Sequence, residues 1–468
     1  MKTKEQLSFS YPIDKVNIEI SYKDKLINLL KSNLDFHNQQ SNYSSHNFHS
    51  FPAKFPPQLP KKFIEELTKP NEIVLDPMVG SGTTIVEAFL ANRKGIGLDI
   101  DPLSLKLSKI KTSPINPKKV IESAKLIYRN SKYDIENNIK FLKSLLEKYF
   151  DTKTKEFVDY WFLPEIQLEL IALLNQISKI DDVLIRNFFK VTFSSIIITK
   201  TGGVSLALDL AHTRPHKAKI IIDKNNSVRY GKEIFDSDSS RKSYLTKTLR
   251  SPLDEFWKKV TQNLKSIVHY HPQRIEPDFN FCDSQNLSLN DDSVDLIITS
   301  PPYASNAIDY MRAHKFSLIW LGYNIEELTF KRKQYIGGEL ISDFLFEELP
   351  PFSVKKVQKL SDLDSKRGAV LKRYYSEMAR VIKEMYRVLK PNKAAIVVVG
   401  NSIMKGIDTE TFKCLAEIGE SIGFKVPHIG VRNLDRNKRM LPVGYKTNLN
   451  SQIQQRMHKE YIIGFYKP

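Results

Sequence analysis

Hydrophobic positions along the chain recur with two periods, one typical of helices and one typical of buried strands, and the two alternate after residue 50. Apolar residues at helical spacing predict a helix over residues 58–68. Short apolar runs predict strands over residues 72–76 and 95–99, with a helix over residues 85–92 between them. Strands that alternate with helices form a parallel sheet covered on both faces, so this unit predicts the first half of a doubly wound sheet.

The same alternation returns in the second half of the chain. Strands are predicted over residues 278–281, 294–298, 394–399, 426–431 and 461–466, and helices over residues 308–321, 370–389 and 409–422. The residues between the two α/β segments have a mainly helical pattern. We therefore expect an α/β fold, a doubly wound Rossmann-like sheet with a mainly helical insertion.

These patterns divide the chain into four segments. Residues 1–50 are expected to form a polar N-terminal arm, and residues 38–50, which are rich in Asn, Gln, Ser and His, predict a loop or mobile arm. Residues 51–116 hold the first part of the α/β domain, and residues 117–270 form the helical insertion. Residues 271–468 hold the second part of the domain, which ends in a basic segment.

The charge balance indicates a polyanionic partner. The chain has 71 Lys and Arg against 53 Asp and Glu, a formal net charge of +18. Basic side chains that neutralise phosphates release counterions, which stabilises a complex with nucleic acid. Charge alone therefore favours a nucleic-acid partner but does not say which one.

Other residue types narrow the classes of protein and site. Only two cysteines are present, so the sequence predicts neither a disulfide framework nor a four-ligand zinc site. His212 and His216 lack a nearby carboxylate or cysteine, so we expect no metal there. The chain start has no apolar signal segment, and no apolar run approaches a membrane span. We therefore expect a cytoplasmic protein.

A glycine-bearing turn joins the first strand to the helix after it. Its residues are Asp76, Pro77, Met78, Val79, Gly80, Ser81, Gly82 and Thr83. The glycines let the backbone approach a ligand, and the helix start presents N–H groups to it. Asp99 ends the second strand, where an acid accepts hydrogen bonds from two ribose hydroxyls. We prefer Asp99 to Asp101, which lies beyond the strand. A nucleoside cofactor is predicted rather than NAD, because the third glycine of the dinucleotide fingerprint is missing.

A second segment with candidate chemistry follows the strand predicted over residues 294–298. It consists of Ser300, Pro301, Pro302 and Tyr303. The two prolines remove two N–H donors, so nearby carbonyls stay out of a sheet ladder. The Ser300 hydroxyl and the Ser300 or Pro301 carbonyl can then accept both N–H bonds of an exocyclic amino group. Tyr303 offers a flat face to a planar base.

The turn over residues 76–84 and the segment over residues 300–303 together resemble the bacterial amino-methyltransferases of DNA. The resemblance implies S-adenosylmethionine as cofactor and double-stranded DNA as partner. It also implies that Ala53, Lys54 and Phe55 line the methionine end of the cofactor and that Asp283 approaches its adenine ring. The chain departs from the family pattern at Met78, where an aromatic residue is usual, and at Phe51, where histidine is common.

The target atom follows from the same resemblance. In that family a Ser-Pro-Pro-Tyr segment goes mostly with cytosine N4 and an Asp-Pro-Pro-Tyr segment mostly with adenine N6. We therefore expect cytosine-N4 methylation, in a restriction–modification or related defence system with a possible partner nuclease. Adenine N6 remains the alternative. Carbon-5 methylation is disfavoured because neither cysteine follows a proline and that reaction needs a thiolate nucleophile.

Further alternatives remain open at this stage. Some RNA enzymes that methylate guanine N2 share the turn and a similar Pro-Pro-Tyr, but residues 1–50 are too short for their usual RNA-binding module. A non-catalytic nucleic-acid-binding protein is a third possibility. Residues 117–270 are our candidate for target recognition, with a purely structural or oligomerisation role as the alternative.

Overall fold

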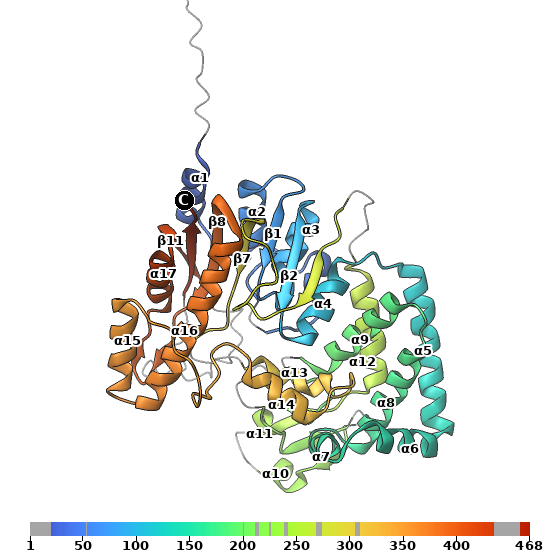
Figure 1. Cartoon of the computed structure of the whole chain (residues 1–468). Helices are drawn as coiled ribbons and strands as arrows, with labels where there is room; N and C mark the ends of the chain where they lie inside the picture. The colour runs from blue at the N-terminus through green and yellow to red at the C-terminus, as the bar shows by residue number, and fades with distance from the viewer. Residues whose placement is uncertain are drawn as a thin grey trace, which may run out of the picture.

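The computed structural model describes residues 20–52, 54–199, 201–210, 215–223, 226–237, 242–267, 274–304, 309–434 and 459–468. Within these residues a seven-stranded sheet has the order β11-β12-β8-β7-β1-β2-β6. Its strands are β1 (Ile73–Asp76), β2 (Lys94–Asp99), β6 (Asp278–Phe281), β7 (Val294–Thr299), β8 (Leu389–Gly400), β11 (Lys425–Asn433) and β12 (Lys459–Tyr466). Figure 1 shows the early strands β1 and β2 beside the late strands β7 and β8.

Most of the sheet is parallel. β1 pairs in parallel with β2 and β7, β2 with β6, and β7 with β8. β12 is antiparallel to β8 and to β11. The chain passes outward from β1 to β2 on one side and returns through β7 on the other, so the strand order reverses at β1. Ligands of open α/β sheets bind outside the carboxyl ends of the strands at such a point. The expected doubly wound α/β fold is confirmed.

Helices cover both faces of this sheet. On one face lie α1 (Tyr22–Lys31), α2 (Gln58–Leu67) and α3 (Thr83–Leu90), and on the other α15 (Pro351–Ser361), α16 (Ser365–Val388) and α17 (Thr411–Ile422). Neighbouring strand residues point to opposite faces, so Val74 packs in the first layer and Leu75 in the second. A short hairpin of β9 (Ile403–Met404) and β10 (Ile407–Asp408) follows β8.

Within the predicted polar N-terminal arm, residues 22–31 form a helix, α1, that the sequence analysis did not predict. Leu26, Leu29 and Leu30 fall on one face of this helix and are buried. They pack in the same apolar layer as Ile462 of β12. A further turn of 3-10 helix, η1 (Ser44–Asn47), buries His46. The partner surface of α1 comes from the far end of the chain, so the local polar composition gave no sign of it.

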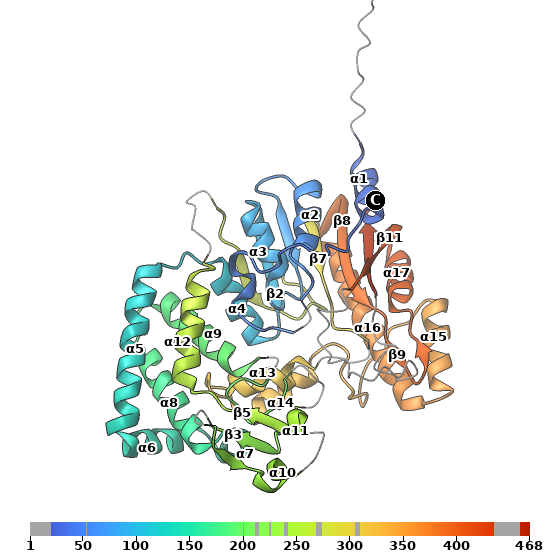
Figure 2. The same ribbon diagram turned by 180° about the vertical axis from the view of Figure 1, so that it is seen from behind.

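Residues 117–264 contain most of the remaining helices (Figure 2). These are α5 (Pro117–Asn137), α6 (Ile139–Tyr149), α7 (Thr152–Trp161), α8 (Pro164–Ser178), α9 (Val183–Ile197), α10 (Lys232–Asp236), α11 (Lys242–Leu245) and α12 (Pro252–Leu264). The helical pattern did not predict a small sheet of β3 (Ile220–Ile222), β4 (Val228–Tyr230) and β5 (Thr246–Thr248). β3 pairs in parallel with β5. Strands of three residues are too short to give a recognisable pattern in the sequence.

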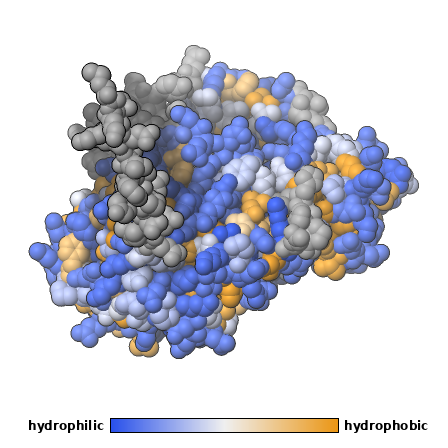
Figure 3. Space-filling view, turned by 90° about the horizontal axis from the view of Figure 1, so that it is seen from above, coloured by the Kyte–Doolittle hydropathy of each residue, from blue (hydrophilic) through white to orange (hydrophobic). Residues whose placement is uncertain are grey.

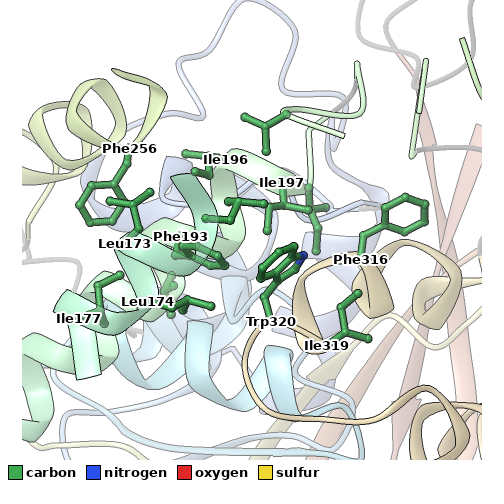
Figure 4. Packing of buried hydrophobic residues seen from close by; sticks show 14 of the residues in the cluster. Leu173, Leu174, Ile177, Phe193, Ile196, Ile197, Phe256, Phe316, Ile319 and Trp320 are labelled. Atoms are coloured by element: carbon green, nitrogen blue, oxygen red, sulfur yellow. The ribbon is translucent and has the colours of Figure 1, made fainter. Parts of the chain in front are cut away.

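One apolar core joins this helical part to the polypeptide after β7. That polypeptide forms α13 (Tyr310–Leu318) and α14 (Ile325–Lys333). Figure 4 shows Trp320 beside Phe193 of α9, and Phe316 belongs to the same apolar cluster. The same cluster includes Leu103 and Leu107 of α4 (Pro102–Thr112), the helix that follows β2. The core therefore fixes α13 between the helical part and the carboxyl edge of the sheet.

The surface of the described part carries mostly polar side chains on the face seen in Figure 3, with hydrophobic residues in small patches. None of the helices in the described ranges is long and apolar enough to cross a membrane.

Candidate active site

Four chain segments meet at the carboxyl edge of the sheet, after β1, β2, β6 and β7, and they line one cavity that opens to solvent. The cavity is lined by these residues predicted from the sequence: Lys54, Phe55, Asp76, Pro77, Gly80, Ser81, Thr83, Asp99, Asp283, Ser300 and Pro302. Gly82, Pro301 and Tyr303 adjoin the lining residues without contributing to the wall. Ala53 lies outside the described residues.

The glycine turn depends on backbone conformations that favour glycine. Gly80 has φ +47° and Gly82 has φ +79°, and Gly82 is the N-cap of α3. A Cβ at Gly82 would lie 2.6 Å from Ser108 Oγ, so this position has no space for a side chain. The turn therefore brings its backbone against the cavity wall at the start of a helix, where N–H groups attract polar or anionic ligand atoms.

Asp99 stands at the end of β2 with each carboxylate oxygen bound to one backbone group. Oδ2 accepts a hydrogen bond from Gly80 N–H at 2.8 Å, and Oδ1 accepts one from Asp101 N–H at 2.9 Å. A carboxylate offers about four acceptor positions, so both oxygens keep capacity for further donors. These contacts fix the carboxylate against the turn and leave it able to accept two hydroxyl groups in the cavity.

Asp101, the competing acid, has its acceptor capacity taken up by the protein. Its Oδ1 caps α4 by accepting Leu103 N–H at 2.8 Å. Its Oδ2 accepts the Tyr335 hydroxyl at 2.9 Å and lies 2.5 Å from His314 Nδ1. Burial opposes ionisation of Asp101, but the contacts with His314 and Tyr335 hold its pKa below the usual value. Asp99 is thus the acid better placed for a ligand.

Burial changes the acid–base behaviour of the carboxyl groups at this edge. Burial, together with the nearby charge of Asp101, raises the pKa of Asp99 to about 7. Burial also raises the pKa of Asp76 to about 6. Asp76 Oδ1 accepts the Met78 N–H at 3.2 Å, which holds the entry of the turn.

The Ser-Pro-Pro-Tyr segment leaves the sheet where β7 ends at Thr299. Ser300 and Pro302 face the cavity, while the hydroxyl of Tyr303 donates a hydrogen bond to Glu460 Oε1 at 3.1 Å. Arg432 forms an ion pair with the same Glu460 from the neighbouring strand β11. Burial and the charge of Glu460 raise the pKa of Tyr303, so its phenol stays protonated as a donor.

Comparison with known proteins relates the sequence of this chain to one family. A family described as DNA methylase matches residues 2–109. The type II methyltransferase M.MvaI of Kocuria varians is 26% identical to the chain, over 97% of this chain and 98% of its own length. The type II methyltransferase M.AvaI of Nostoc sp. is 24% identical, over 91% of this chain and 89% of its own length. These comparisons support the bacterial S-adenosylmethionine-dependent DNA amino-methyltransferase family for this chain.

Similarity to solved structures is weak by comparison. A TehB-like S-adenosylmethionine-dependent methyltransferase from Corynebacterium glutamicum shares 9% identity, covers 87% of each chain and gives a TM-score of 0.28. A similarity of this size has no weight for function. The family assignment depends on the sequence relatives.

The cavity of this DNA methyltransferase suits its cofactor, S-adenosylmethionine. The cofactor carries a ribose with two hydroxyls, and Asp99 keeps acceptor capacity for both. Gly80 lies against Phe51 in the cavity wall: a Cβ added at Gly80 would be 3.5 Å from the Phe51 ring. Asp283, after β6, also lines the cavity and is exposed. The residues present therefore fit the group.

Three residues of the DNA methyltransferase site escaped the sequence reasoning. Tyr310 lines the cavity beside Phe51, with ring centroids 5.8 Å apart, and Tyr335 lines it while bound to Asp101. Lys111 is buried below the turn and donates to the Ser81 carbonyl at 2.5 Å. Burial lowers its pKa well below the usual value. In sequence Lys111 is one lysine among many, and only the fold brings it under the turn.

Proposed function

We propose that this enzyme methylates the exocyclic N4 of cytosine in double-stranded DNA, as the modification enzyme of a type II restriction–modification system. The observation that carries the cytosine assignment is a neutral serine, Ser300, in the cavity wall at the end of β7. The system assignment is supported by the names of the relatives, which are type II methyltransferases. A cognate nuclease is part of this proposal.

Ser300 has a defined role in the proposed reaction. Its hydroxyl accepts one N–H of the cytosine amino group, and a carbonyl of Ser300 or Pro301 accepts the other. With both hydrogens held, the nitrogen lone pair is oriented toward the methyl donor, which removes most of the orientational cost of the reaction. When bound, S-adenosylmethionine supplies a methyl group: its bond to sulfur breaks as the new N–C bond forms, the sulfur leaves as a neutral thioether, and the amino nitrogen gives up one proton to solvent.

Tyr303 is proposed to stack on the target base, and Glu460 and Arg432 position it. The Tyr303 hydroxyl is held by Glu460 at 3.1 Å, and Arg432 balances the charge of Glu460. The hydrogen bond from the Tyr303 hydroxyl to Glu460 restricts rotation of the Tyr303 ring before the base binds. Base stacking then costs less ordering entropy.

We expect Tyr303→Ala to lower turnover strongly while cofactor affinity stays nearly unchanged. Stacking of a base on an aromatic ring is worth roughly 1–3 kcal/mol, and a misplaced amino group adds to the loss of rate. Tyr303→Phe is the matched control, because it keeps the ring and removes only the bond to Glu460. Single-turnover methyl transfer and calorimetry measure the two effects. An Ala variant with the native rate would exclude a stacking role.

Target recognition is proposed for residues 117–270. A base inside a duplex is out of reach of the cavity, so the enzyme must turn it outward and read the flanking sequence with another part of the chain. The helical part shares one core with α13, the first helix after the Ser-Pro-Pro-Tyr segment in the described part of the chain. This connection supports the proposal, because base readout would then be mechanically joined to the catalytic segment.

The product of the reaction is expected to be N4-methylcytosine. Nucleoside mass spectrometry of DNA treated with the enzyme and labelled cofactor identifies the methylated base directly. A mutated recognition sequence, once known, serves as the negative substrate. N6-methyladenine as the sole product would refute the cytosine assignment and leave the DNA methyltransferase assignment intact.

A further inference from the structure

A second cavity lies on another face of α13, the helix that also closes the cofactor cavity. Tyr310 of α13 lines the cofactor cavity. Four residues of the same helix line the second cavity: Met311, Arg312, Lys315 and Phe316. The other walls are Trp161 of α7, Pro215, and Leu328, Thr329 and Arg332 of α14. One helix therefore serves as a shared wall for both cavities.

Positive charge exceeds negative charge in this second cavity. Arg312, Lys315 and Arg332 face a single carboxylate, Asp309. Arg332 reaches Asp309 Oδ2 through Nε at 2.7 Å and Nη2 at 2.6 Å, and Arg312 Nε reaches the same oxygen at 2.9 Å. Among the described residues, one carboxylate is thus shared by two guanidinium groups, and Lys315 adds a further positive charge beside them.

Lys315 is the cation that this carboxylate does not reach. Among the described residues its Nζ has no hydrogen bond or ion pair, and it lies over the face of the Phe157 ring, 4.9 Å from the centroid. Burial, and then repulsion from Arg332, lower the pKa of Lys315. An anion in the cavity would relieve this repulsion and pair the ammonium group.

We propose that this cavity binds a backbone phosphate of the DNA strand that carries the target base. The proposal rests on the DNA methyltransferase function and adds a phosphate site to it. Guanidinium and ammonium groups are the usual partners of DNA phosphates, and they position the duplex without reading its sequence. The Trp161 indole in the same wall gives an apolar surface for the sugar beside that phosphate.

The position of the cavity limits which phosphate is bound. A helix with its side chains is about 10–12 Å across, so the two cavities are separated by about that distance. Successive nucleotides rise about 3.4 Å along a strand. The bound phosphate therefore belongs to a nucleotide within about three positions of the target base. A contact so near the base would hold the strand while the base leaves the stack.

The salt dependence of DNA binding tests the phosphate contact. We expect Lys315→Gln to reduce the slope of log affinity against log salt by about 0.9, the value for one lost phosphate contact. Lys25→Gln is the matched control, because it removes the same charge from an exposed position on α1. Arg332→Gln should act like Lys315→Gln. Fluorescence anisotropy with a labelled duplex measures the slope for all four proteins.

A neutral phosphate analogue identifies the contact itself. Single methylphosphonates are placed in turn along the target strand. One position within about three nucleotides of the target should weaken binding by the native enzyme and leave Lys315→Gln unaffected. The proposal would be overturned if every methylphosphonate position weakened binding by Lys315→Gln as much as binding by the native enzyme. It would also be overturned if the same position left Lys25→Gln unaffected.

Two further results separate this proposal from others. If inorganic phosphate stabilises the native protein and not Lys315→Gln while both proteins show the same salt slope for DNA binding, the cavity binds a free anion. That result would overturn the assignment to a DNA phosphate. Methyl transfer is measured in parallel with labelled cofactor at saturating DNA. If the native enzyme transfers methyl groups to DNA and Lys315→Gln keeps the native salt slope, only the phosphate site is refuted. If the native enzyme transfers methyl groups to no DNA, the underlying function is refuted.

Discussion

Replacing Asp99 by alanine is expected to weaken S-adenosylmethionine binding by roughly two to four powers of ten. The variant removes a charged acceptor from two ribose hydroxyls, and each such hydrogen bond is worth about 1.5–3 kcal/mol. Isothermal calorimetry measures the change in affinity. Thermal unfolding of the same sample shows whether the turn has survived, since Asp99 also accepts the Gly80 N–H.

Asp99→Asn is the control that separates charge from hydrogen bonding. It keeps an acceptor for the backbone and removes the charge. Because the pKa of Asp99 is raised to about 7 by burial and by the charge of Asp101, the native carboxyl is protonated below that pH. Native cofactor affinity should therefore rise as the pH passes upward through about 7, and the part of this rise due to Asp99 should be absent in the Asn variant. Unchanged affinity in a folded Asp99→Ala protein would contradict the assignment and direct attention to Asp101.

Replacing Ser300 by alanine should lower the rate of methyl transfer by roughly two to three powers of ten. Removal of one positioned hydrogen-bond partner from an active site costs about 2.7–4 kcal/mol in the transition state. The loss should appear in single-turnover rates with DNA and cofactor both saturating. Cofactor affinity should stay near the native value, because Asp99, and not Ser300, is the proposed acceptor of the ribose hydroxyls.

Ser300→Thr is the matched control for the hydroxyl. It keeps the acceptor oxygen and adds one methyl group, so it should retain much more of the rate than Ser300→Ala. Equal rates for the native enzyme and Ser300→Ala would remove the hydroxyl from the proposed mechanism. Equal losses in the Ala and Thr variants would mean that the space around Ser300, not its acceptor, controls the reaction.

The local pattern of the sequence determined the sheet and the two chemical segments. The strands over residues 72–76, 95–99 and 294–298 were predictable because buried parallel strands are short, continuous apolar runs. Gly80 and Gly82 marked the turn because glycine favours positive φ, and the structure gives both residues positive φ. The sequence thus indicated which loops face the ligand, since the carboxyl ends of parallel strands share one edge.

Only the tertiary structure decided which side chains complete the site. Asp101 and Asp99 are two residues apart, and the choice between them depends on His314 and Tyr335, which lie more than two hundred residues away in the chain. Glu460 reaches Tyr303 across a sequence distance of 157 residues. Such contacts follow from how strands and helices pack, and no local period or propensity records them. The helix α1 was missed for the same reason, because its apolar partners lie in strands at the other end of the chain.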